Sequence, residues 1–316
     1  MKKLIVIAAM LTGITAAQAQ EDNNILNHLG VGVEVGTTGI GFELGAPITD
    51  YVQVRAGMSF MPSFKVKDIN VDVDMNQDAW NGTSGVRTQL EKFSNVRYAD
   101  GSSLSAADQS VVKRVADHND FLPTNVMVDG KLKFTNFKFL VDVFPIKSSS
   151  FHATVGFYAG SANVVDLVTT SDPDDMQLVA DYNASGLVNQ TLKGDFVYNG
   201  QTVTQSFTMP GKLQGKIGNG SKVVAPEGST MCGYVKTSAF RPYVGVGFGR
   251  VVPKKTRLAF ACDLGVMFWG TPKIYINQSA GDVEITKDDV DNNTIKNLSK
   301  LTVYPCLNFR LTGKIF

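Results

Sequence analysis

Residues 29–60 read LGVGVEVGTTGIGFELGAPITDYVQVRAGMSF, and this stretch decides the fold. Apolar side chains alternate with small or charged ones through 29–36, 40–46 and 52–60, and turn-forming residues separate the three runs. Successive side chains of a β-strand point to opposite faces, so strict alternation indicates a strand with one apolar and one polar face. The stretch therefore predicts three consecutive strands.

The same alternation returns five more times along the chain. Two long insertions, residues 61–130 and 161–238, interrupt the series. Eight amphipathic strands are compatible with a soluble sandwich, in which the apolar faces form a protein core, and with a membrane barrel, in which they meet lipid. The expected strands span about 29–36, 39–46, 51–60, 131–144, 151–160, 239–250, 256–268 and 300–316.

The lengths of the connections favour the barrel. Short connections follow the second, fourth and sixth strands, whereas long ones follow the third, fifth and seventh, although the connection after the first strand is also short. Outer-membrane barrels alternate short periplasmic turns with long outer loops, and closure leaves no sheet edge in lipid. We therefore predict an all-β fold, an eight-stranded antiparallel transmembrane β-barrel with long extracellular loops.

The first residues predict export. Lys2 and Lys3 precede an apolar run at 4–14, and Ala17-Gln18-Ala19 has the small-x-small pattern of a cleavage site. This pattern indicates a cleavable signal peptide over residues 1–19. No later apolar run is long enough for a membrane helix. The expected location is the Gram-negative outer membrane, with both termini in the periplasm.

Charge and cysteine content exclude two classes of protein. The formal net charge is +1 for the whole chain and −1 once the two signal-peptide lysines are removed, which argues against a nucleic-acid partner. Three cysteines are too few for a disulfide framework. Cys262 falls on the outward phase of its strand and Cys306 on the inward phase, so no bridge between them is expected.

The inward phase of the strands carries charges of both signs. Eight strands leave a lumen with room only for side chains, so we expect a salt-bridge network that fills a closed interior. The alternative is a narrow path for ions or small solutes. The lumen charges are Glu34, Glu43, Arg55, Lys138, Asp142, Asp263 and Arg310.

No catalytic, metal or cofactor site is expected. His152 and Thr154 share an inward face, but a lipid-modifying esterase needs a nucleophile that faces lipid, and no G-x-S-x-G elbow is present. The acidic run 68–78 has Val73 and Ala79 where a calcium loop needs Gly and Glu. We read that run as a polar hairpin with Val71 and Val73 packed inward.

The two long insertions carry local structure signals. Ser105 to Asp108 is a capping box ahead of apolar residues at helical spacing, which predicts a short amphipathic helix. Asn199-Gly200 between two β-rich runs predicts a type I′ hairpin. The loops are therefore expected to be partly ordered.

Two strands resemble those of small OmpA-like outer-membrane barrels. These are RPYVGVGFG at 241–249 and the chain end LNFRLTGKIF at 307–316. The resemblance implies that Phe309, Leu311, Ile315 and Phe316 form a terminal-strand signal for the barrel assembly machinery. One departure is that Phe316 is in phase with the inward residues, whereas Ile315 is on the lipid phase. The resemblance covers about a third of the chain and carries no catalytic motif.

The predicted function is non-enzymatic. We expect an outer-membrane protein that is structural or binds an unknown surface ligand through its long loops, 61–130 and 161–238, with membrane lipid and the assembly machinery as its other partners. The alternatives are a narrow small-solute or ion channel and, third, a lipid-modifying barrel enzyme.

Overall fold

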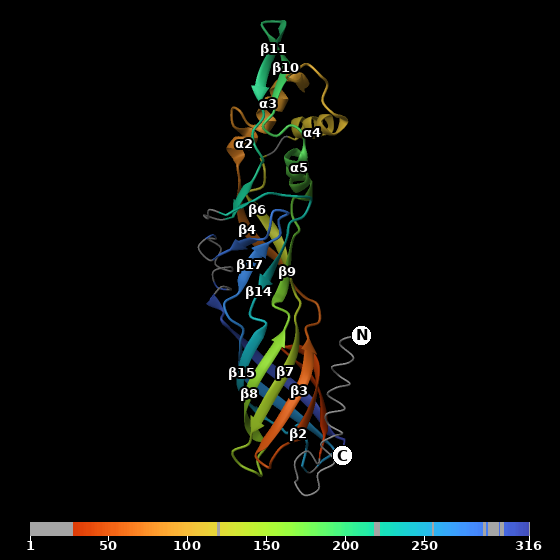
Figure 1. Ribbon diagram of the computed structural model, residues 1–316, viewed down its shortest axis with the longest axis vertical. Coiled ribbons are helices and arrows are strands. Elements are labelled where there is room, and N and C mark those ends of the chain that lie inside the picture. Colours follow the sequence, from red (N-terminus) through yellow and green to blue (C-terminus); the bar gives the residue numbers. More distant parts are fainter. Residues whose placement is uncertain are drawn as a thin grey trace.

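The computed structural model describes residues 28–118, 121–217, 222–254, 256–286, 289, 297 and 300–315 (Figure 1). The expected signal peptide and Phe316 lie outside the described residues. Among the described residues, none of the helices is long and apolar enough to cross a membrane.

Eight strands form a closed antiparallel barrel, which confirms the predicted fold class. The first and last of them close it, since Gly30 pairs with Lys314 and Gly36 with Asn308. Around the barrel the order is β1-β19-β16-β15-β8-β7-β3-β2. The strands are β1 (Gly30–Gly36), β2 (Gly39–Pro47), β3 (Val52–Phe60), β7 (Thr135–Val143), β8 (Phe151–Gly160), β15 (Phe240–Phe248), β16 (Leu258–Phe268) and β19 (Val303–Lys314).

The outer face of the barrel is apolar and the inner face is buried. Val33 is 59% exposed and Phe260 is 65% exposed, while the polar residues between such positions are buried. A continuous apolar exterior of this size is unfavourable in water and is what a lipid-facing surface requires. The outward residues include Val35, Phe42, Phe139, Val155, Val244, Val246, Leu264 and Leu311.

The three long connections fold together beyond the barrel. They form an eight-stranded sheet, called the stem below, in the order β13-β12-β4-β6-β9-β14-β17-β18. Figure 1 shows the stem directly above the barrel. Its strands are β4 (Phe64–Met75), β6 (Asn125–Leu132), β9 (Asn163–Thr169), β12 (Gly215–Ile217), β13 (Val223–Val224), β14 (Cys232–Lys236), β17 (Lys273–Ile276) and β18 (Val283–Ile285).

The stem prolongs the barrel wall. Its middle strands β4, β6, β9, β14 and β17 adjoin in sequence the barrel strands β3, β7, β8, β15 and β16, and both sets have the same spatial order. One expected strand, 131–144, is divided by this arrangement. Lys131 and Leu132 belong to β6, and the barrel strand β7 begins at Thr135. Between the two strands, the backbone N–H of Lys133 donates to Val164 O, and Phe134 O accepts from the backbone N–H of Met61.

The head, which comprises residues 77–117 and 173–213, caps the stem at the end farthest from the barrel (Figure 1). A three-stranded sheet in the order β11-β10-β5 packs there with four helices. The elements are α2 (Gln77–Asn81), α3 (Val86–Lys92), β5 (Ser94–Tyr98), α4 (Ala106–Asp117), α5 (Pro173–Ala184), β10 (Thr191–Tyr198) and β11 (Gln201–Thr208).

Both local predictions for the head are confirmed. The Ser105 hydroxyl accepts from the backbone N–H of Asp108 at 3.1 Å and caps α4. Asn199 and Gly200 both have positive φ, 50° and 77°, and join β10 to β11 as a type I′ turn requires.

The hairpin expected over 68–78 is wrong. These residues instead end one long strand, β4, and begin α2. β4 pairs with β6 and β12, which are distant in sequence. Val73 is buried and Val71 half-buried, as that interpretation required, because their face of β4 lies against the core.

An ion pair links two strands of the head sheet. Asp195 on β10 accepts from Arg97 on β5 at 3.0 Å and from Thr204 at 2.7 Å. The Arg97 hydrogen bond, followed by that of Thr204, lowers the pKa of Asp195 to about 2. A lowered pKa stabilises the fold above the unfolded value of about 4, and this stabilisation is lost as the pH falls through the folded value.

We therefore expect the protease resistance of the head to be constant from neutral pH down to about pH 4 and to fall below it. Limited proteolysis across this range measures the effect. Asp195→Asn should lack this part of the acid response. An identical acid profile for the variant and the native chain would show that Asp195 does not carry it.

Candidate functional site

The barrel lumen holds all seven charged residues that the sequence placed on inward faces. They come from six of the eight strands, and each is buried. Ion pairs connect them into one network across the lumen. The residues are Glu34 on β1, Glu43 on β2, Arg55 on β3, Lys138 and Asp142 on β7, Asp263 on β16 and Arg310 on β19.

Arg55 lies at the centre of this lumen network. Its Nη1 is 3.3 Å from Glu43 Oε2 and 3.2 Å from Asp263 Oδ2, and its Nε is 2.8 Å from Asp142 Oδ2. Arg310 pairs with the same Glu43 and Asp263, at 2.7 Å each. Two planar guanidinium groups are thus shared between two carboxylates, an arrangement suited to the fork of donors on arginine.

Lys138 and His152 extend the network. Lys138 Nζ is 2.5 Å from Glu34 Oε2 and 2.7 Å from Glu43 Oε2. His152 Nε2 is 2.9 Å from Asp263 Oδ1, and Nδ1 is 3.2 Å from Ser150 O. Both ring nitrogens of His152 therefore face oxygen atoms. The sequence put His152 on the inward face but did not indicate its carboxylate partner.

Small residues leave the space that the network occupies. A Cβ added to Gly247 would lie 2.2 Å from Asp263 Oδ1 and 2.6 Å from His152 Nε2. Gly245 and Gly265 stand beside the Tyr243 ring in the same way. The glycine-rich inward faces therefore allow long charged and aromatic side chains to cross a narrow lumen.

An apolar and aromatic layer lies in the part of the lumen toward the stem. Leu140, Tyr158, Tyr243, Met267 and Cys306 are buried there as one cluster, and the rings of Tyr158 and Tyr243 meet edge to face at 5.5 Å. Lys138 lies opposite Tyr158 in the pairing of β7 with β8, so the cluster adjoins the charged network.

Arg241 covers the same end above the aromatic layer. Its guanidinium donates to Ser238 O at 2.7 Å and also to the side chain of Asn136 and to Ser161 O. The sequence placed Arg241 on the inward phase of the "RPY" strand but assigned it no role. Its role as a lid was not indicated, because its acceptors lie on other strands and connections.

The opposite end of the barrel, called the short-turn end below, is also filled. Val251 and Val252 are buried although they lie in a turn, and Val251 N donates to the Gln53 side chain at 3.2 Å. Arg250 lies over the Phe144 ring, 3.7 Å from its centroid. The turn therefore folds inward and covers the lumen network from below.

The other candidate residues lie on the barrel surface or at its end. Phe309, Leu311 and Ile315 are exposed on the outer face, and Phe316 lies outside the described residues. Cys306 is buried inside the barrel, while Cys262 lies on the other face of the neighbouring strand. The part of the chain that the structure describes holds no cluster of side chains suited to a metal ion.

The sequence matches no protein-family model and no curated protein. Similar crystal structures include CarO2 and CarO of Acinetobacter baumannii, each 14% identical over 92% of this chain, with TM-scores of 0.39 and 0.38 and 100% and 99% of those chains covered. A major outer membrane protein of Thermus thermophilus is 10% identical over 91% of this chain and 98% of that chain, with a TM-score of 0.28. The barrel assignment rests on the closed sheet and its apolar exterior.

Proposed function

We propose that this protein is a non-enzymatic outer-membrane anchor, closed to solutes, that displays the stem and head for binding at the cell surface. The observation that carries the proposal is the filled lumen. Side chains occupy it from the inward turn at Val251, through the lumen network, to the aromatic layer and Arg241. A barrel that is filled along its length serves as a support, and binding is left to the part beyond it.

The orientation follows from the two ends of the barrel. Outer-membrane barrels place short turns in the periplasm and long connections outside. We infer that the short-turn end faces the periplasm and that the stem and head face the exterior. The terminal strand presents Phe309, Leu311 and Ile315 outward, where we expect the assembly machinery and then membrane lipid to contact them.

The channel alternative requires a continuous polar path, and the apolar cluster in the lumen argues against one. Ion conduction needs a wet route, whereas the cluster around Tyr158 and Tyr243 places apolar contacts inside the lumen. Opening a path through the lumen network would require separation of buried ion pairs, which is costly because each charge would lose its partner in a low dielectric.

The burial of the candidate catalytic residues argues against the enzyme alternative. His152 is fully buried between Asp263 and Ser150, and Thr154 donates to Asp142 at 2.8 Å. A lipid substrate would have to reach these groups through the barrel wall. Their hydrogen bonds are those of members of the lumen network.

Labelling of intact cells tests whether the stem faces the cell exterior. Cys232 in the stem is exposed, whereas Cys262 lies on a barrel strand and Cys306 is buried. A membrane-impermeant maleimide should therefore modify Cys232 on intact cells, and Cys232→Ser should abolish the signal. In that background, Ser148→Cys at the short-turn end should react only after the outer membrane is permeabilised. Labelling of Cys232 only after permeabilisation would refute the proposed orientation.

A further inference from the structure

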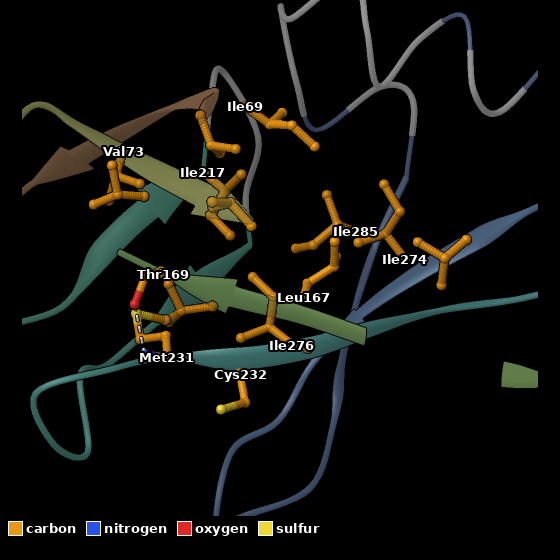
Figure 2. A pocket seen from close by; sticks show the side chains of 16 residues that line it. Ile69, Val73, Leu167, Thr169, Ile217, Met231, Cys232, Ile274, Ile276 and Ile285 are labelled. Carbon is orange, nitrogen blue, oxygen red and sulfur yellow. Dashed lines mark hydrogen bonds between the residues drawn. The ribbon is translucent and has the colours of Figure 1, made fainter. Parts of the chain in front are cut away.

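The stem encloses an apolar cavity of about 120 Å³ (Figure 2). Every strand of the stem contributes to its wall, because the sheet curls around the space. Figure 2 shows side chains from both ends of the sheet, such as Ile217 and Ile285, approaching the same space. The cavity lies between two apolar clusters, one shared with the head and one next to the barrel.

The wall offers almost no polar contact. Most of its side chains are aliphatic. The hydroxyl of Thr169 is already engaged, since it accepts from the backbone N–H of Met231 at 2.8 Å. A cavity with so few free polar groups cannot hold water well, because water needs two to four polar partners.

The cavity is accessible from outside. Ile69, Val128, Leu167 and Ile276 point into it yet are only half-buried. Among the described residues, no backbone pairing joins the edge strands β13 and β18. The sheet therefore forms a trough with a seam and not a sealed core.

Hydrogen bonds of side chains, and not strand pairing, join the two sides of the seam. The Gln278 amide accepts from Ala225 N and donates to Ala225 O, both at 3.0 Å. The Glu227 carboxylate accepts from the backbone N–H and the hydroxyl of Ser279. These few contacts join the segment after β13 to the segment after β17, and they can separate without breaking a strand pair.

We propose that the stem cavity binds a short aliphatic chain, either a free medium-chain fatty acid or the end of a lipid acyl chain. The size and chemistry support this ligand class. Dry apolar cavities of about 150 Å³ bind molecules of the size of benzene, so this one accepts roughly six carbon atoms. The inference rests on the proposed display of the stem and adds a ligand class and a site to it.

Photocrosslinking with an aliphatic probe tests the inference. The full chain in lipid nanodiscs is irradiated with octanoic acid that carries a terminal diazirine, and the adducts are mapped by mass spectrometry. We expect adducts on β9, β14 and β17 in addition to those on the lipid-facing barrel strands, which serve as an internal positive control. Excess unlabelled octanoate should suppress the stem adducts and leave the barrel adducts unchanged.

Cavity-filling variants provide matched controls. Val128→Phe, Leu167→Phe and Ile276→Phe each fill the space from a different strand, and each should lower the stem adducts about tenfold because the ring occupies the ligand volume. Val197→Phe adds the same bulk at the exposed hairpin tip and should change nothing, since Val197 is 74% exposed. A phospholipid with the diazirine in its acyl chain distinguishes a membrane lipid from a free acid as the source of the chain.

Two results would overturn the inference. One is labelling confined to the barrel strands with both probes. The other is stem labelling that persists in all three filled variants and in excess octanoate, since it would then arise outside the cavity. Neither result changes the labelling of Cys232 by the impermeant maleimide. A failed test of ligand binding in the cavity can therefore be distinguished from a failed test of the stem's exposure at the cell surface.

Discussion

Replacing Arg55 with methionine is expected to lower the free energy of unfolding of the barrel by about 3–5 kcal/mol. Arg55 is paired with Glu43, Asp142 and Asp263, and all four side chains are buried. Without the guanidinium, three carboxylates face one another with fewer cations among them. Breaking a buried ion pair costs more than the pair contributed, because an uncompensated charge stays behind. Urea titration in lipid vesicles, followed by the gel mobility of the folded barrel, measures the change.

An exposed arginine provides the control for Arg55. Arg114 on α4 pairs with Asp181 on α5 at the surface of the head, and both side chains are partly exposed. Arg114→Met should cost about 0–1 kcal/mol, as exposed pairs generally do. Combining Arg55→Met with Asp142→Asn should restore part of the loss by removing one of the unpaired charges. A double variant less stable than Arg55→Met would contradict the network.

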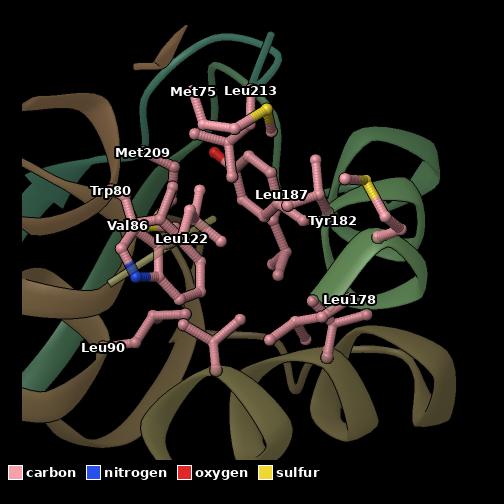
Figure 3. Close-up of a cluster of buried hydrophobic side chains, with 14 of the residues drawn as sticks. Met75, Trp80, Val86, Leu90, Leu122, Leu178, Tyr182, Leu187, Met209 and Leu213 are labelled. Carbon is pink, nitrogen blue, oxygen red and sulfur yellow. The ribbon is translucent and has the colours of Figure 1, made fainter. Parts of the chain in front are cut away.

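Replacing Trp80 with alanine should unfold the head and leave the barrel intact. Trp80 is 0% exposed and packs with Val86, Leu90 and Leu122 in the head core (Figure 3). Truncating a large buried aromatic residue costs about 3–5 kcal/mol, because it removes apolar burial and leaves a cavity. Limited proteolysis should cut the variant within 77–117 and 173–213 and release a protected barrel.

The matched control for Trp80 is Val197→Ala at the hairpin tip, which should keep the protease resistance of the native head because Val197 is mostly exposed. The gel mobility of the folded barrel reports on the barrel alone, whereas protease resistance reports on the head. Loss of the folded barrel together with the head in Trp80→Ala would show that the two fold as one unit.

The barrel strands were predictable from the sequence because the pattern that marks each strand depends only on the residues of that strand. Each strand must present apolar groups to lipid and small or charged groups to the lumen, so a period of two marks every strand, as in β19, where Phe309 and Leu311 alternate with buried Arg310 and Thr312. The inward phase also identified the seven lumen charges. It did not indicate which charges meet, since the partners of Arg55 depend on the size and register of the closed barrel.

The stem was not predicted, for a related reason. Most of its strands are short and pack against apolar clusters, so both phases can carry apolar residues. Val164 and Val165 are adjacent on β9, yet both pack in the cluster next to the barrel. Strands with this composition lose the alternation that reveals a half-exposed sheet. Their pairing, such as β4 with β12, also joins segments far apart in sequence.

The head was predicted only where its signals are local. The cap at Ser105 and the turn at Asn199-Gly200 depend on a few neighbouring residues, and both appear as expected. The core that joins α2, α3, α4 and α5 depends on contacts between two separate insertions, which no single segment encodes.

Single-channel recording in planar bilayers tests the central claim, that the barrel is a closed support for a surface domain. The native chain is compared with one in which short Gly-Ser turns replace residues 77–123 and 173–213, a change that removes the head and leaves the lumen residues in place. Because the lumen network and the cluster around Tyr243 fill the barrel, neither protein should give steady conductance steps. Steady, ion-selective conductance from either protein would contradict the account, since it would require a continuous wet path past Arg55 and Tyr243.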